Sequence, residues 1–137
     1  MDAHRITSIV YEYTDSPVPP RYHRSYAITV DRDSVRIVVD SYGEVLASGN
    51  YSTGTETFEE VCAALAEAGL SVGSERENDG CTGGTTETVT VRNAEGVVME
   101  GWVYHCGGGD YGTLRGNAGH LAAAVKALIP DLEELLR

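Results

Sequence analysis

Two β-hairpins can be read from the alternation of apolar and polar residues, and they constrain the fold more than any other feature of the sequence. The first joins residues 26–30 to residues 35–42 through a turn at Arg32-Asp33. Because successive side chains of a strand point to opposite faces, this turn places six apolar side chains on one face. They form three cross-strand pairs, Tyr26 with Val39, Ile28 with Ile37 and Val30 with Val35.

The second hairpin turns at residues 93–96, where Gly96 suits the left-handed position that closes a three-residue loop. Its register gives three further cross-strand pairs, Val91 with Met99, Val89 with Gly101 and Glu87 with Val103. The opposite face of this hairpin presents threonines and two aromatic side chains, namely Thr88, Thr90, Trp102 and Tyr104. Both hairpins therefore predict an antiparallel sheet with one apolar face.

Two segments have the spacing of amphipathic helices that would cover this apolar face. Residues 57–69 carry an apolar stripe at helical spacing that includes Cys62, so this cysteine is predicted to be a buried and inert thiol. The second helix is expected to begin at Asn117, which is a favourable N-cap residue. Pro130 interrupts its apolar pattern and predicts a kink or a break into two short helices.

Strands are also predicted over residues 6–13 and 45–52, which are rich in β-branched and aromatic residues. The expected fold class is α+β, a two-layer antiparallel sheet of five or six strands with two helices packed on one face. The elements follow the order β-β-β-β-α-β-β-α along the chain. Residues 1–137 are expected to form a single α+β domain, because this length suits one hydrophobic core.

The formal net charge is −11, and residues 51–100 hold ten acidic residues against only Arg76 and Arg92. An acidic field repels nucleic acid and anionic membranes, and it favours a basic partner or a merely solvated surface. No apolar run reaches the roughly eighteen residues of a membrane span. The first five residues lack the apolar core of a signal peptide. The cytoplasm is therefore the expected compartment, or the periplasm or exterior if a leader has been removed.

Cys81 and Cys106 are predicted to leave the same open end of the second hairpin, because its extended register places Cys81 opposite Gly109 and Cys106 opposite Gly84. Glycines beside each cysteine let the two backbones approach closely. A disulfide here would close a loop of about 25 residues. Two other interpretations stay open, namely separate structural thiols, as a reducing cytoplasm favours, or a reactive or metal-bound pair. No zinc-ligand spacing is present, and no metal or other cofactor is expected.

Residues 104–120 read Y-H-C-G-G-G-D-Y-G-T-L-R-G-N-A-G-H and connect a strand to a helix. A glycine-rich connection of this kind can bind an anion at a helix N-terminus, which makes Cys106, Asn117 and His120 the candidate ligand or anion site. The stretch lacks the established phosphate-loop patterns, and Asp110 would repel phosphate. The alternative is a structural loop that wraps over the end of the sheet. No catalytic residue is predicted, because no third group is identifiable to orient Cys106 and His120.

The sheet face turned away from the helices is the candidate interface. It is expected to present Trp102 and Tyr104 from one hairpin and Arg36 and Val38 from the other, and large aromatic and arginine side chains often anchor interfaces. The sequence thus favours a small acidic protein-binding or inhibitor/immunity-type module without catalytic activity, whose partner is a basic protein or a second copy. The alternative is an enzyme or a small-ligand or metal-binding protein that uses residues 104–120 with Cys81.

Overall fold

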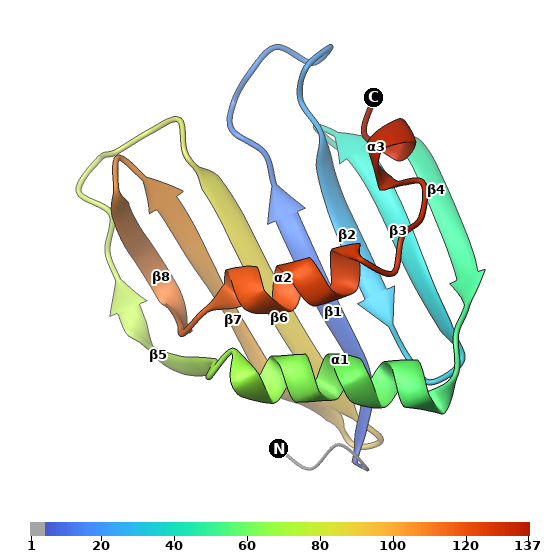
Figure 1. The fold of residues 1–137 in the computed structure, drawn as a ribbon. Helices are drawn as coiled ribbons and strands as arrows, with labels where there is room; N and C mark the ends of the chain where they lie inside the picture. Colours follow the sequence, from blue (N-terminus) through green and yellow to red (C-terminus); the bar gives the residue numbers. More distant parts are fainter. Residues whose placement is uncertain (1–4) are drawn as a thin grey trace.

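The structure is a computed structural model that describes residues 5–137 and arranges them around one eight-stranded antiparallel sheet (Figure 1). The strands in chain order are β1 (Ile6–Thr14), β2 (Ser25–Val30), β3 (Ser34–Ser41), β4 (Glu44–Ser52), β5 (Ser71–Arg76), β6 (Thr85–Asn93), β7 (Gly96–Cys106) and β8 (Gly109–Arg115). Across the sheet they lie in the order β4-β3-β2-β1-β6-β7-β8-β5. The first strand of the chain is therefore central, and it joins the two halves of the sheet.

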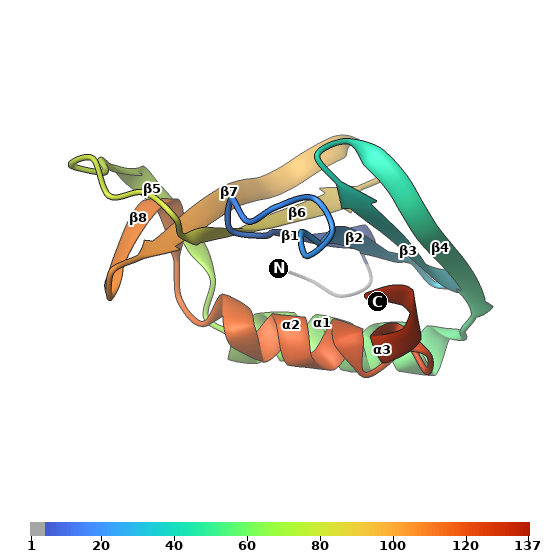
Figure 2. The same cartoon turned by 90° about the horizontal axis from the view of Figure 1, so that it is seen from above.

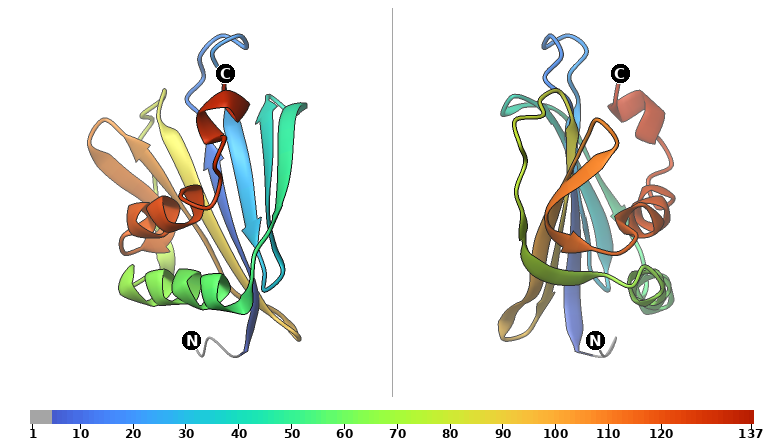
Figure 3. Two further views of the ribbon diagram at one scale, coloured as in Figure 1. Left: turned by 45° about the vertical axis from the view of Figure 1, so that its right-hand side comes forward. Right: turned by 90° about the vertical axis from the view of Figure 1, so that its left-hand side faces the viewer.

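Three helices lie on one side of this sheet (Figures 2 and 3). They are α1 (Thr55–Glu67), α2 (Ala118–Lys126) and α3 (Leu132–Leu135). Helices α1 and α2 run side by side across the sheet. The core fills the space between them and the apolar faces of the central strands, and each fully buried aliphatic or aromatic side chain stabilises the fold by about 1.5–3 kcal/mol. Its largest fully buried members are Ile9, Ile28, Val30, Val35, Ile37, Val39, Phe58, Val89, Val91, Leu121 and Val125.

Both predicted hairpin registers are confirmed. In the β2–β3 hairpin, Ile28 pairs with Ile37 and Val30 with Val35. In the β6–β7 hairpin, the three predicted pairs form as the alternation requires, and the register shifts only near the turn, between Val91 and Arg92. The apolar members of both hairpins face the helices. A local period-two pattern with a short turn is thus sufficient to fix strand register here.

The predicted fold class is wrong in its numbers of strands and helices. Eight strands replace the expected five or six and three helices replace the expected two, and 49% of the described residues are in strands against 20% in helices. The additional strands are β5 and β8. Residues 104–120, which include β8, were interpreted as a glycine-rich connection, and the expected order of elements has no strand over the residues of β5.

Glycine geometry explains why residues 109–115 form a strand. Gly107 and Gly108 have φ values of 60° and 82°, so they make a tight two-residue turn that returns the chain beside β7. Gly112 has a φ of 108°, and a Cβ at this position would lie 2.4 Å from the carbonyl oxygen of Trp102. The glycines therefore permit close strand pairing, whereas the sequence pattern had indicated a loop over the sheet end.

Pro130 separates α2 from α3, which confirms the predicted interruption of the last helical segment. Helix α2 ends at Lys126, and α3 begins at Leu132. The proline ring cannot supply a backbone N–H and clashes with the preceding helical turn. Leu132, Leu135 and Leu136 nevertheless pack against the core from their half-buried positions. The break thus lets the end of the chain turn toward β2 and β3 (Figure 3).

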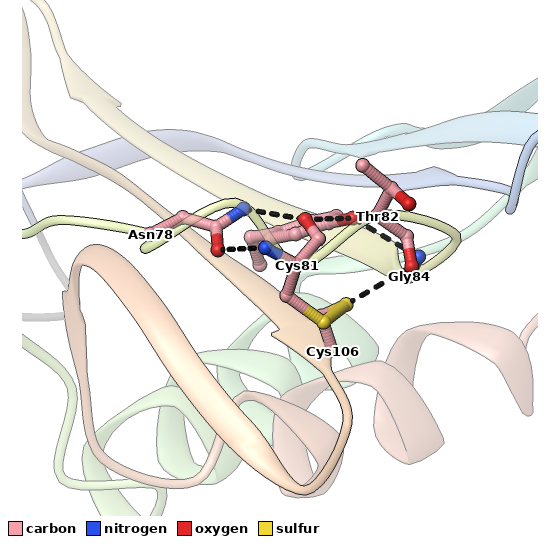
Figure 4. Close-up of a disulfide and its surroundings, with 6 residues drawn as sticks. Asn78, Cys81, Thr82, Gly84 and Cys106 are labelled. Carbon is pink, nitrogen blue, oxygen red and sulfur yellow. Dashed lines mark hydrogen bonds between the residues drawn. A yellow bond between two sulfur atoms is a disulfide. The ribbon is translucent and has the colours of Figure 1, made fainter.

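Cys81 and Cys106 form a disulfide, with their Cα atoms 6.1 Å apart (Figure 4). Cys81 lies in the loop before β6, and Asn78 holds this loop because its side chain accepts a hydrogen bond from the Cys81 amide and donates one to the Cys81 carbonyl oxygen. At Gly84 a Cβ would lie 2.0 Å from the carbonyl oxygen of His105. The close approach that the glycines were predicted to allow is therefore present.

We expect removal of this disulfide in the double variant C81S/C106S to lower the free energy of unfolding by about 3 kcal/mol, because the open chain regains the entropy of a loop of 25 residues. Urea unfolding of the variant and the oxidised wild type measures the difference. Thiol counting in denaturant without reductant should give one free thiol in the wild type, from buried Cys62. A count of three would contradict the bond.

Candidate functional site

A cavity of about 500 Å³ lies between the sheet and α2, near the ends of β1, β6 and β7. The sheet contributes mainly ionisable and hydroxyl-bearing side chains to its wall, namely Tyr11, Tyr13, Tyr26, Thr85, Glu87 and His105. The helix contributes small residues and one lysine, namely Gly119, Ala122, Ala123 and Lys126. Asp15, Arg24 and Leu136 complete the lining. The cavity thus combines aromatic surface with groups of both charges.

Strand register brings the polar wall together. Tyr13 of β1 pairs with Tyr26 of β2 on one side and with Glu87 of β6 on the other. These three side chains consequently form one row across three strands, on the face that carries the core. The next row on this face joins Tyr11 to Ile28 and Val89, and the row beyond it joins Ile9 to Val30 and Val91, all of them buried. The polar row lies instead where α2 presents Gly119, Ala122 and Ala123, which are too small to fill the space above it.

A chain of short hydrogen bonds runs along this wall from the interior to the surface. The Tyr11 hydroxyl donates to Oε2 of Glu87 over 2.6 Å, and Nε2 of His105 lies 2.6 Å from Oε1 of Glu87. Nδ1 of His105 lies 2.7 Å from Oδ1 of Asp110. Side-chain exposure rises from 14% at Glu87 through 39% at His105 to 61% at Asp110. The His105 ring thus lies between two carboxylates, and in its doubly protonated, positively charged form both ring nitrogens donate hydrogen bonds.

The surroundings shift the pKa values of these groups in directions that follow from their contacts. Burial would lower the pKa of His105, but the hydrogen bonds to Asp110 and Glu87 outweigh it and raise the pKa above its ordinary value. Burial, and then the hydrogen bond to Glu87, raises the pKa of Tyr11. Burial also raises the pKa of Tyr26 to about 12. The site therefore holds protonated tyrosines beside a carboxylate and a readily charged imidazole.

Such an arrangement can orient a polar ligand and can hold or release a proton at His105. The Tyr26 hydroxyl makes no hydrogen bond with another residue in the described range 5–137, so it is available to a ligand. Tyr13 stacks on Tyr26 with ring centroids 5.2 Å apart, which fixes the aromatic floor of the cavity. The Tyr13 hydroxyl lies 3.4 Å from Asp15.

The candidate ligand site predicted from residues 104–120 does not assemble. Cys106 is buried and bonded to Cys81. Asn117 caps α2, as its side chain accepts a hydrogen bond from the His120 amide. The His120 ring lies 2.9 Å from Glu67 of α1 and is exposed. These three residues are placed by contacts within the chain, whereas His105 of the same stretch lines the cavity and has Asp110 as a hydrogen-bond partner.

The candidate interface residues lie on the helix-free face but are distributed across it. Trp102 pairs with Thr88, and this row continues through Glu12 and Ala27 to Val38, so three strands separate Trp102 from Val38. Trp102 is half-buried. Trp102 and Val38 thus belong to the same cross-strand row, but the four predicted residues do not form one compact cluster.

Tyr104 lies on β7, the strand of Trp102, and Arg36 lies on β3, the strand of Val38. The Tyr104 hydroxyl accepts a hydrogen bond from the Gly84 amide over 3.0 Å, and its ring lies near that of Tyr111. Tyr104 thus anchors the loop before β6. Arg36 is exposed on β3. An interface over this face would therefore have to span most of the sheet.

Sequence reasoning missed Tyr11, Glu87 and the partnership of His105 with both carboxylates. A signal was present: Glu87 occupies a core-facing position that alternates with Val89 and Val91, where an acidic residue is unusual. His105 lies within the stretch 104–120 but was not named as a site residue. The pairing of β1 with β6, on which the site depends, joins segments about 76 residues apart, as the Tyr11–Glu87 contact shows.

Comparison of the chain with protein-family models, with curated proteins and with solved structures finds no significant match. In residues 5–137 no group of three or more His, Cys, Asp or Glu side chains is arranged to hold a metal ion. Within the same range no helix has the length and apolar character needed to cross a membrane. The expectation about a leader concerns residues 1–4 as well, and these lie outside the described part of the chain.

We expect the pKa of His105 to lie above its ordinary value of 6.5 and to fall in D110N, because this variant removes one carboxylate partner. A pH titration of the His105 ring signals by NMR measures both. Since the folded-state pKa is the raised one, protonated His105 stabilises the fold fully below pH 6.5, and this contribution is lost as the pH rises through the folded-state pKa.

The control is H105Q, which cannot titrate at this position. The free energy of unfolding of the wild type, measured relative to H105Q, should decline as the pH rises above 6.5. A His105 pKa at or below that of an unfolded peptide would contradict the hydrogen-bond chain.

Proposed function

We propose that the protein binds a small polar molecule in the cavity between α2 and the sheet. The observation that carries this proposal is the chain from Tyr11 through Glu87 to His105 along the cavity wall. Ionisable groups with shifted pKa values that line one cavity are typical of functional sites. A ligand-binding role is the small-ligand alternative that the sequence allowed, moved from residues 104–120 to a site that shares only His105 and Gly119 with that stretch.

Packing alone gives no reason for this arrangement. Burial of a carboxylate is costly, and well-packed apolar residues of similar volume often stabilise a protein as much as a buried ion pair or more. The row of Val30, Ile9 and Val91 on the same sheet face is wholly apolar, and larger residues on α2 would close the gap. The cavity volume of about 500 Å³ lies within the range of small-molecule sites. These features together support binding rather than stability as the role of the polar row.

The disulfide supports an oxidising compartment as the place of action. Structural disulfides persist in secreted and periplasmic proteins and are rare in the reducing cytoplasm. Cys81 and Cys106 are paired. We therefore favour the periplasm or the exterior over the cytoplasm that the amino-terminal residues alone suggested. The ligand would then be a molecule encountered outside the cytoplasm.

The variant A123L tests the proposed site, because Ala123 is exposed on α2 and lines the cavity, so a leucine there occupies part of its volume. Ligands are first found by NMR screening of a library of small polar compounds. We expect A123L to weaken their binding at least tenfold while changing the free energy of unfolding by less than about 0.5 kcal/mol. Calorimetric titration and urea unfolding provide the two measurements.

The matched control is A63L, which adds the same atoms at an exposed alanine of α1 away from this cavity. It should bind the ligands as the wild type does. Compounds that bind A123L as tightly as the wild type would place any ligand site elsewhere and would contradict the proposal.

A second candidate function is recognition of a basic protein through the helix-free sheet face. The observation that favours it is the row from Trp102 to Val38, which crosses five strands without a covering helix. Glu12 and Glu100 lie on the same face, and the net charge of −11 complements a basic partner. This is the protein-binding function that the sequence favoured, including the inhibitor or immunity type.

Trp102 is the chain's only tryptophan, so its fluorescence reports on this face. We expect poly-L-lysine, used as a basic probe, to shift its emission to shorter wavelength, and the double variant E12Q/E100Q to weaken this response severalfold at low salt. The double variant E133Q/E134Q removes equal charge from α3 and should retain the response. Equal behaviour of the two variants would indicate non-specific attraction and would exclude the face as a recognition surface.

A further inference from the structure

We infer that the ligand of this cavity carries an oxyanion, a carboxylate or a phosphate, which binds at Lys126 and Arg24 while the rest of the molecule extends over the tyrosines toward Glu87. This inference rests on the proposed function, since it names the chemical class of the molecule that occupies the same cavity. It depends on where the few basic side chains of an acidic protein lie and on what they contact.

Basic residues gather at one end of the cavity. The sequence has 10 lysine and arginine residues against 21 acidic ones. Arg24 and Lys126 both line the cavity, Arg21 lines a neighbouring hollow together with Arg24, and Arg137 lines another together with Lys126. Nε of Arg24 donates to the main-chain oxygen of Arg137 over 3.4 Å. Two of the ten basic residues therefore line the cavity, and two more line hollows that share Arg24 or Lys126 with it.

The two cations that line the cavity have no side-chain carboxylate partner among residues 5–137. Nη1 of Arg24 donates to the carbonyl oxygens of Pro20 and His23. Lys126 is half-buried, and its side chain makes no ion pair or hydrogen bond with another residue in the range 5–137. Lys126 is the last residue of α2, and a helix C-terminus favours a positive charge. This effect alone does not explain why the lysine lines the cavity. The positive charge of this end is thus available to an external anion.

The acidic groups around this end do not remove that availability. Asp15 lines the cavity, but its carboxylate already accepts hydrogen bonds from the backbone amides of Ser16 and Arg24. Asp131, Glu133 and Glu134 line the hollow on the other side of Lys126. They lie within its electrostatic reach without forming an ion pair. An oxyanion within the cavity would accept a charge-assisted hydrogen bond from Lys126. None of these surface carboxylates accepts such a bond from Lys126.

The opposite end of the cavity offers groups that suit hydroxyl or ring substituents rather than a second anion. Glu87 accepts from Tyr11 and is paired with His105, so an anion beside it would be repelled. Tyr26, Tyr13 and Glu87 occupy adjacent strands, so the row from Tyr26 to Glu87 spans about 10 Å. A one-ring hydroxy acid matches this order of groups.

Lys126 is the only lysine in the sequence, which permits a direct test. The protein is acetylated with an amine-reactive ester, and modification of Lys126 is followed by mass spectrometry in the presence of three probes. These are 4-hydroxybenzoate, its neutral isostere 4-hydroxybenzamide and inorganic phosphate. We expect an oxyanion to slow acetylation severalfold and the amide to have no effect. Protection by the acid but not by phosphate assigns a carboxylate ligand, and the reverse assigns a phosphate.

Calorimetric titration of the protecting probe into variants completes the test. K126Q should lower its affinity at least tenfold, which is the loss of one charge-assisted hydrogen bond. The control R92Q removes the same charge at an exposed position on β6 away from the cavity, and it should change the affinity less than about twofold.

The outcomes separate this inference from the proposed function. If the amide binds as well as the acid and K126Q has no effect, while A123L abolishes binding, the cavity binds a ligand and the oxyanion inference is overturned. If neither oxyanion protects Lys126 at millimolar concentration, the inference is also overturned. If an oxyanion binds A123L and the wild type equally, it binds at the surface, and both proposals fail.

Discussion

The pairing of β1 with β6 is the interaction on which the remaining structure depends. β1 is the first strand in the chain and lies in the middle of the sheet, so it joins the β2–β3–β4 meander to the strands that follow α1. Its apolar side chains, such as Ile9, complete the core between two hairpins that would each expose an apolar face. The same register places Tyr13 beside Glu87. One non-local pairing thus creates both the continuous core and the polar row, and an error of one residue would turn both to the opposite face.

The parts of the fold that the sequence predicts are those with local causes. Each hairpin is specified by alternation within about twenty residues, and Pro130 ends a helix through its own ring. The strands β5 and β8 could not be predicted in this way. Their residues lack apolar alternation, and their pairing depends on Gly107, Gly108 and Gly112, whose conformations serve a turn and a close contact with Trp102. Glycine-rich sequence is equally compatible with a loop, so only the neighbouring strand decides between them.

The candidate site shows a second limit of sequence reasoning. The partners of His105 come from other elements: Glu87 from β6, Tyr11 from β1 through Glu87, and Asp110 from β8. None of these contacts has a motif. What the sequence does contain is a set of polar residues at core-facing positions near the same ends of several strands. Such a set becomes informative once strand order is known, because burial of ionisable groups needs a compensating reason.

The disulfide and the hydrogen-bond chain act on the same pair of strand ends, and this links stability to the geometry of the cavity. Cys106 directly follows His105, and Cys81 lies in the loop that leads into the strand carrying Glu87. The covalent bond therefore restrains the end of β7 relative to the start of β6. At these ends the sheet would otherwise fray, because terminal strand pairs have fewer neighbours. Nε2 of His105 lies 2.6 Å from Oε1 of Glu87 at these strand ends, so the disulfide limits the motion of the polar groups in the cavity wall.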